Sequence, residues 1–116
     1  MPASNQEKEF VAYIVDLMQS IGPVTVRPMF GGFGIFLDKT MFGLVADSVL
    51  YFKVDQQSCS TFEARNLEPF RYVKNNKSYS MSYYQAPDEA LENADDMAQW
   101  ANQAYRVAIK ARKDKK

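Results

Sequence analysis

The sequence of 116 residues contains no histidine and a single cysteine, Cys59. Without histidine, Ser-His-Asp catalysis, imidazole acid–base chemistry and nearly all transition-metal sites are excluded. One cysteine cannot form an internal disulfide or a thiolate zinc cage, and a lone thiol is typical of a reducing compartment. No second cysteine is present to resolve an oxidised thiol, so we interpret Cys59 as a plain small residue.

Long hydrophobic runs and net charge are also missing. The longest mostly apolar run, residues 29–37, is too short to span a bilayer, and the first residues do not resemble a secretory signal. We therefore expect a cytoplasmic protein without membrane contact. The 14 basic residues equal the 14 acidic residues, so no global positive field favours nucleic acid.

The composition is that of one globular domain, with 47% hydrophobic and 24% charged residues. We expect residues 1–116 to form a single domain, with a core at about residues 8–109 and a solvated basic tail at residues 110–116. Cofactor and metal motifs are lacking. An enzyme would have to work with carboxylates, tyrosine, lysine or the one thiol, so we expect a protein that is not an enzyme.

The first half of the chain changes from a helical to an extended pattern. Apolar residues recur at helical spacing over residues 10–21, and Gly22-Pro23 ends that predicted helix. Residues 24–54 are rich in β-branched and aromatic residues, with turn signals at Asp38-Lys39 and Asp47-Ser48. This pattern predicts a meander of three antiparallel strands.

The second half predicts a short helix, a hairpin and two further helices. Asp55 is a suitable cap for the short helix, which Asn66 closes in the left-handed region. Asn75-Asn76 predicts the tight turn of the hairpin, and Pro87 and Asn93 mark the last two helix starts. The predicted fold class is two-layer α+β, with a five-stranded antiparallel sheet in the order α-β-β-β-α-β-β-α-α.

A glycine cluster, Gly31-Gly32-Phe33-Gly34, follows Met29-Phe30. Backbone N–H groups of such a cluster can hold a phosphate, but the P-loop lysine is absent and the cluster leads into a strand. The alternative is a bulge or a twisted strand where another backbone passes closely. We favour this structural interpretation.

Basic and aromatic residues alternate in the predicted hairpin. Arg71, Lys74 and Lys77 lie among several tyrosines, including Tyr83 and Tyr84. Three interpretations remain: core packing with solubilising charge, a nucleic-acid face that stacks bases, or a surface for a protein partner. Strand alternation should bury about half of these tyrosines. The acidic run at residues 88–96 fits helix capping better than catalytic carboxylates or a calcium loop.

An ordered set of phrases resembles the N-terminal domain of the TfoX/Sxy family, bacterial regulators of competence gene expression. The likeness covers about residues 8–109, and no single phrase carries it alone. The phrases are Met29-Phe30-Gly31-Gly32-Phe33-Gly34, Met41-Phe42-Gly43-Leu44-Val45-Ala46-Asp47, Leu50-Tyr51-Phe52-Lys53-Val54-Asp55, Pro69-Phe70-Arg71-Tyr72 and Met81-Ser82-Tyr83-Tyr84. The resemblance implies a fold like that of secretion chaperones and, by that analogy, a homodimer.

The resemblance also implies a non-enzymatic co-activator of transcription in competence. Its implied partners are the cyclic-AMP receptor protein or RNA polymerase, with DNA contacted indirectly. Two features depart from the family pattern: full-length members carry a second, C-terminal domain, whereas this sequence ends at Lys116 as a stand-alone relative or an excised domain would, and Asp38-Lys39-Thr40 replaces the common glycine of the first hairpin turn. The alternative is a nucleic-acid-binding domain that uses the basic hairpin and the basic tail.

Overall fold

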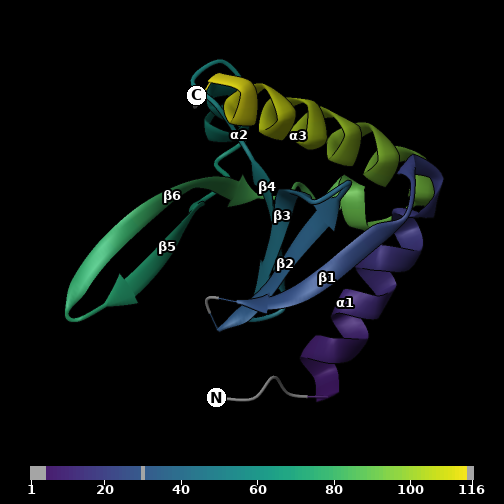
Figure 1. Ribbon diagram of the computed structural model, residues 1–116, viewed down its shortest axis with the longest axis horizontal. Helices are drawn as coiled ribbons and strands as arrows, with labels where there is room; N and C mark the ends of the chain where they lie inside the picture. The colour runs from purple at the N-terminus through teal and green to yellow at the C-terminus, as the bar shows by residue number, and fades with distance from the viewer. Residues whose placement is uncertain (1–4, 30, 115–116) are drawn as a thin grey trace.

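A single antiparallel sheet forms the centre of the molecule (Figure 1). The computed structural model describes residues 5–29 and 31–114. Within them the sheet has six strands in the spatial order β1-β2-β3-β4-β6-β5, and every neighbouring pair is antiparallel. The strands are β1 (Val24–Met29), β2 (Gly32–Leu37), β3 (Thr40–Ala46), β4 (Val49–Lys53), β5 (Pro69–Lys74) and β6 (Lys77–Gln85).

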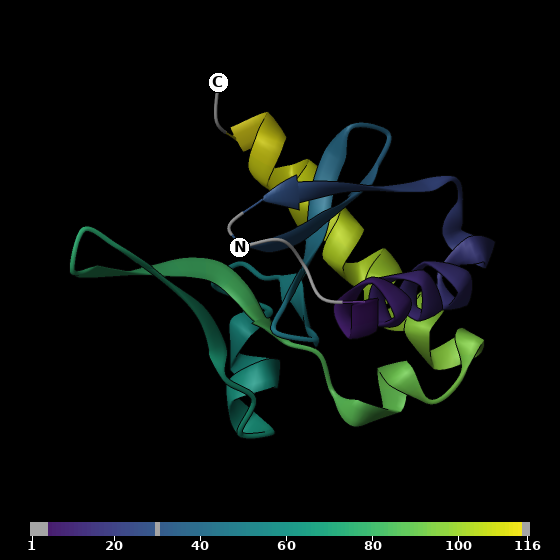
Figure 2. The same cartoon turned by 90° about the horizontal axis from the view of Figure 1, so that it is seen from below.

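The helices form a second layer on one side of this sheet (Figures 1 and 2). Helix α3 is the longest and contacts β3 and β4, while α1 lies against α3 and α2 against β6. The α+β class is therefore confirmed. The helices are α1 (Asn5–Leu17), α2 (Cys59–Ala64) and α3 (Ala94–Asp114), with 3-10 turns η1 (Gln19–Ile21) and η2 (Asp88–Leu91).

The prediction of five strands is wrong by one strand, because residues 24–54 form four strands rather than three. The chain turns at Gly31, which has a φ of +75°, and this turn separates β1 from β2. The sequence interpretation had treated the glycine cluster as an irregularity within a strand. The expected close approach of another backbone is confirmed, because a Cβ on Gly32 would lie 2.0 Å from the carbonyl oxygen of Val45. Phe30 lies outside the described residues.

The three predicted hairpin turns are confirmed. Asp38-Lys39, Asp47-Ser48 and Asn75-Asn76 each have two consecutive positive φ angles, as a two-residue hairpin turn requires. Asn66 also adopts a positive φ where α2 ends. Asn93 caps α3, because its Oδ1 accepts the N–H of Asp96 at 2.8 Å.

Two helix expectations need correction. The turn after Pro87 is the 3-10 turn η2 rather than an α-helix. Helix α3 continues through residues 110–114, so most of the expected tail is the last part of a helix. Residues 115–116 lie outside the described part of the chain.

The main core lies between the helical layer and the sheet. Ile14 of α1, Phe42 of β3, Phe52 of β4 and Met97 of α3 are all completely buried there. The predicted apolar stripe of α3 faces this core, with alanines at 101, 104 and 108. These short side chains let the helix axis lie close to the strands, so the sheet has one thoroughly covered face.

Candidate interaction face of the sheet

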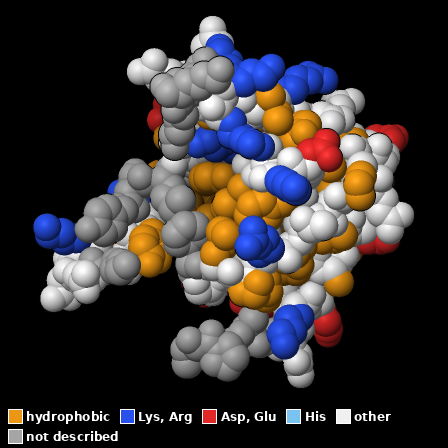
Figure 3. Space-filling model, in the orientation of Figure 1, with side chains coloured by type: hydrophobic (Ala, Val, Ile, Leu, Met, Phe, Trp, Pro, Cys, Tyr) orange, Lys and Arg blue, Asp and Glu red, His pale blue; other side chains and the backbone are white. Residues whose placement is uncertain are grey.

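The opposite face of the sheet carries no helix in the described residues (Figures 1 and 2). Strand pairing places Gly34, Leu44 and Tyr51 side by side on this face, in β2, β3 and β4. We call it the uncovered face. Its apolar side chains are Met29, Phe36, Met41, Leu44, Tyr51, Phe70, Tyr72 and Tyr83. Figure 3 shows apolar side chains gathered in a hollow of the surface, with lysines and arginines around them.

One half of the uncovered face is a small second core. Leu44, Phe70 and Tyr83 are buried together in a cluster separate from the main core. Strand β6 separates β5 from β4, yet the rings of Tyr51 and Phe70 are only 5.1 Å apart in an edge-to-face contact. The sheet must therefore curl, and its β5–β6 hairpin extends away from the other strands as an arm (Figure 1).

The other half of the uncovered face remains accessible and is centred on Gly34. A Cβ on Gly34 would meet the Sδ of Met29 at 2.7 Å, the ring of Phe36 at 3.0 Å and the Sδ of Met41 at 3.3 Å. These three side chains cover the glycine and are only partly buried. Methionine side chains are flexible and polarisable, which suits a surface that adapts to a bound partner.

Basic side chains lie on the aromatic rings of this face. The guanidinium of Arg27 is 5.5 Å from the centre of the Phe36 ring, and the Nζ of Lys53 is 5.4 Å from the centre of the Tyr83 ring. In such contacts the cation lies over an aromatic ring but does not shield the apolar surface completely from solvent. The uncovered face thus combines an apolar floor with a positive border.

The predicted contact residues of the hairpin do not meet on one surface. Tyr83 is buried on the uncovered face, and burial raises its pKa to about 12, so its phenol is neutral. Tyr84 lies on the helical side, where its hydroxyl donates to Glu63 of α2 at 2.6 Å, and this bond raises its pKa to about 12. Strand alternation therefore separates the two tyrosines: Tyr83 is buried, and Tyr84 is partly buried on the other side.

The predicted basic residues are spread along the hairpin. Arg71 is exposed and close enough to Tyr84 to influence it electrostatically. Lys77 is exposed beside the turn at the hairpin tip, and Lys74 pairs with it across the two strands. The side chain of Lys74 lies outside the described part of the structure. The sequence analysis did not identify Arg27, Phe36 and Lys53 as residues of a candidate interaction face. The only signal for them in the sequence was the alternation of side chains within residues 24–54.

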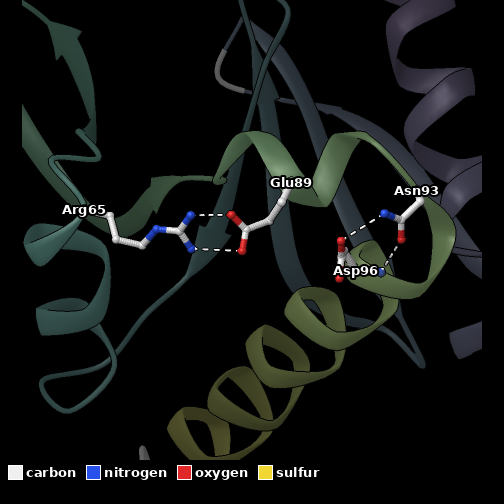
Figure 4. A network of polar contacts seen from close by, with 4 residues as sticks. All are labelled: Arg65, Glu89, Asn93 and Asp96. Carbon is white, nitrogen blue, oxygen red and sulfur yellow. Dashed lines mark hydrogen bonds and ion pairs between the residues drawn. The ribbon is translucent and has the colours of Figure 1, made fainter.

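The acidic run on the helical side has a structural role. Arg65 of α2 and Glu89 of η2 form an ion pair, and that pairing lowers the pKa of Glu89 (Figure 4). Figure 4 also shows Asn93 and Asp96, which bond reciprocally at the start of α3. No group of acidic or cysteine side chains suited to a metal ion occurs in the searched residues, 5–29 and 31–114.

Fold and surface together define an α+β domain whose sheet presents one apolar face to contact. Comparison with known proteins then gives the family: the family model of the TfoX N-terminal domain matches residues 16–108. The chain therefore belongs to the TfoX/Sxy family, as its resemblance predicted. Across residues 5–29 and 31–114, none of the helices has the length and apolar character needed to cross a membrane.

Two relatives illustrate the relationship. The DNA transformation protein TfoX1 of Aliivibrio fischeri is 31% identical over 81 residues, which are 70% of this chain and 37% of that protein. Protein Sxy of Escherichia coli K12 is 27% identical over 94 residues, which are 81% of this chain and 41% of that protein. The chain thus spans roughly two fifths of the length of these relatives.

Proposed function

We propose that this domain regulates competence, the state in which bacteria take up DNA, by binding a protein partner through the uncovered face. Membership of the TfoX/Sxy family and the name of the TfoX1 relative support the competence role. The proposed action is contact rather than catalysis.

The uncovered face is the observation that carries this proposal. Phe36 and Met41 are only partly buried, although the same strands bury Ile35 and Phe42 completely on the helical side. A contiguous apolar surface with a polar or charged border is typical of protein interaction sites. Aromatic residues, methionine and arginine are enriched in such sites, and all three are present here.

The resemblance points to the cyclic-AMP receptor protein or RNA polymerase as the partner. Each can be purified and tested separately for binding to the immobilised chain by biolayer interferometry, with and without nuclease treatment. We expect saturable binding of one of them that survives nuclease. The double variant Phe36→Ser with Met41→Ser should lose this binding while its circular dichroism spectrum stays unchanged.

A matched control lies on the helical side. Tyr13 of α1 is 46% exposed, so Tyr13→Ser also removes an exposed aromatic ring, and it should leave partner binding unchanged. Absence of binding to both proteins, or equal loss in the control variant, would contradict the proposed function.

Direct nucleic-acid binding is the second candidate function, favoured by the exposure of Arg71 and Lys77 on the projecting hairpin. Neutralisation of phosphates by lysine and arginine releases counterions, so affinity for duplex DNA should fall steeply as salt increases. A fluorescence anisotropy titration at two salt concentrations tests this. If no binding occurs at low salt, this candidate is rejected.

A further inference from the structure

A pocket of about 280 Å³ lies at one end of the uncovered face. The β2–β3 turn, the end of β4 and the last part of α3 form its walls. Phe36 and Met41 belong both to this pocket and to the uncovered face, so the two surfaces are continuous.

Three basic residues from separate parts of the chain line this pocket: Lys39, Lys53 and Arg112. They come from the turn, from β4 and from α3, which are brought together only by folding. No acidic side chain is among the described residues that line it. A recess lined by side chains of one charge raises the local concentration of oppositely charged groups.

Two of the three cations are held in position by neighbouring side chains. Arg112 donates a hydrogen bond to the hydroxyl of Thr40, which is buried, and Lys53 lies over the ring of Tyr83. A guanidinium carries five N–H donors, so the bond to Thr40 leaves Arg112 able to bind a carboxylate. The hydroxyl of Tyr83 adds no negative charge, because burial raises its pKa to about 12.

Apart from Thr40, the remaining lining residues are apolar or aromatic and include Met41 of β3 and Ala108 and Ala111 of α3. A nucleic-acid backbone needs cations spaced along a track, because its phosphates repeat regularly. Here the cations gather at one end of an apolar surface instead. This arrangement fits a single anionic group attached to an apolar segment, which is the chemistry of an acidic side chain flanked by apolar side chains in a protein.

We infer that this pocket receives an aspartate or glutamate side chain of the protein partner, while apolar side chains next to that residue lie on Phe36 and Met41. The inference rests on the proposed function and adds to it the chemical character of the partner. Lys39, Lys53 and Arg112 then determine which partner segments bind.

The test uses short synthetic peptides as probes, titrated into the full chain labelled with nitrogen-15 for NMR. One peptide is acetyl-Leu-Phe-Glu-Leu-Leu-amide, the second has glutamine in place of glutamate, and inorganic phosphate is a third probe. We expect the acidic peptide to shift the amide signals of residues 39–41 and 53 saturably at millimolar concentrations. Affinity for the glutamine peptide should be lower by roughly tenfold, as expected for a lost charge-assisted hydrogen bond.

Variants of the chain complete the test. Lys39→Gln, at an exposed turn, and Arg112→Gln should each weaken binding of the acidic peptide by roughly fivefold or more. Lys8→Gln is the matched control, since Lys8 is exposed on α1 and its loss changes the net charge equally. Lys39 is not the residue that bonds to Thr40, so a defect in Lys39→Gln cannot arise from loss of that bond.

Several outcomes would overturn the inference. They are equal affinity for the two peptides, no saturable shift at residues 39–41 and 53, or tighter binding of phosphate than of the acidic peptide. Failure of the proposed function is distinguishable, because the unmodified chain would then bind neither purified partner. If the unmodified chain binds a partner and Lys39→Gln and Arg112→Gln bind it equally well, only the present inference fails.

Discussion

The two faces of the sheet are formed by the same strands but differ in what covers them. In β2, Ile35 and Leu37 are buried against the helical layer, while Gly34 and Phe36 belong to the uncovered face. A strand with one solvated face ordinarily places polar side chains on that face. Here the uncovered face is apolar as well, although no helix of the described residues covers it. Folding accounts for the first face, and the proposed contact with a partner would account for the second.

The largest expected effect is a difference in stability between substitutions on the two faces of the sheet. Phe52→Ala removes a completely buried ring between α3 and the sheet, so the free energy of unfolding should fall by about 3–5 kcal/mol. Phe36→Ala removes a partly exposed ring and should cost about 1 kcal/mol or less. Urea unfolding of both variants measures this difference. Equal losses would show that the uncovered face is a structural core.

Two glycines of β2 give a second comparison. A Cβ on Gly32 would collide with the backbone oxygen of Val45, so Gly32→Ala should lower the free energy of unfolding by about 2–3 kcal/mol. At Gly34 the added Cβ meets the sulfur atoms of Met29 and Met41 and the edge of the Phe36 ring, which are side-chain atoms that can shift more easily than backbone. Gly34→Ala should therefore be the milder substitution in thermal unfolding. The reverse order would contradict the close backbone approach at Gly32.

The buried phenol of Tyr83 predicts a pH dependence. Its pKa rises from 10.0 to about 12 on folding because the side chain is buried. The folded state thus binds this proton more tightly than the unfolded state does. The resulting contribution to the free energy of unfolding is complete below pH 10 and is lost as the pH rises towards 12. The loss should amount to about 3 kcal/mol. Chemical unfolding between neutral and alkaline pH should show a weaker pH dependence in Tyr83→Phe, and an unchanged dependence would contradict the assignment.

The smallest effect concerns the helical side alone. Asn93→Ala removes the acceptor for the N–H of Asp96 at the start of α3, and this loss should cost about 1 kcal/mol of unfolding free energy. Partner binding should stay unchanged, because Asn93 caps α3 and so belongs to the helical layer rather than to the uncovered face. Asn93→Asp keeps a side-chain acceptor and should restore most of the stability. A binding defect in Asn93→Ala would show that the two layers are coupled.

Local chemistry explains which features the sequence predicted. The turns at Asp38-Lys39 and Asn75-Asn76 and the cap at Asn93 follow from preferences of single residues, and each is confirmed. The break between β1 and β2 was missed because a glycine cluster fits both a turn and a bulge. The resemblance identified the family correctly.

The uncovered face could not be predicted from the sequence, for a physical reason. In β2 and β3 both faces are apolar, so alternation cannot tell which residues a helix will cover. The pocket lined by Lys39, Lys53 and Arg112 depends on long-range contact between a turn, a strand and the end of α3. The predicted site residues of the hairpin were chosen by composition alone, and their role in binding stays a prediction.

The methionine methyl groups provide the most direct test of the central claim, that the uncovered face binds the partner. Met29 and Met41 lie on the uncovered face, whereas Met18 and Met97 are completely buried in the core on the helical side. The chain labelled with carbon-13 at its methionine methyl groups can be titrated with the purified cyclic-AMP receptor protein and, separately, with RNA polymerase. The account predicts that one of them shifts or broadens the signals of Met29 and Met41 while those of Met18 and Met97 stay sharp. Binding that leaves Met29 and Met41 unchanged would contradict it.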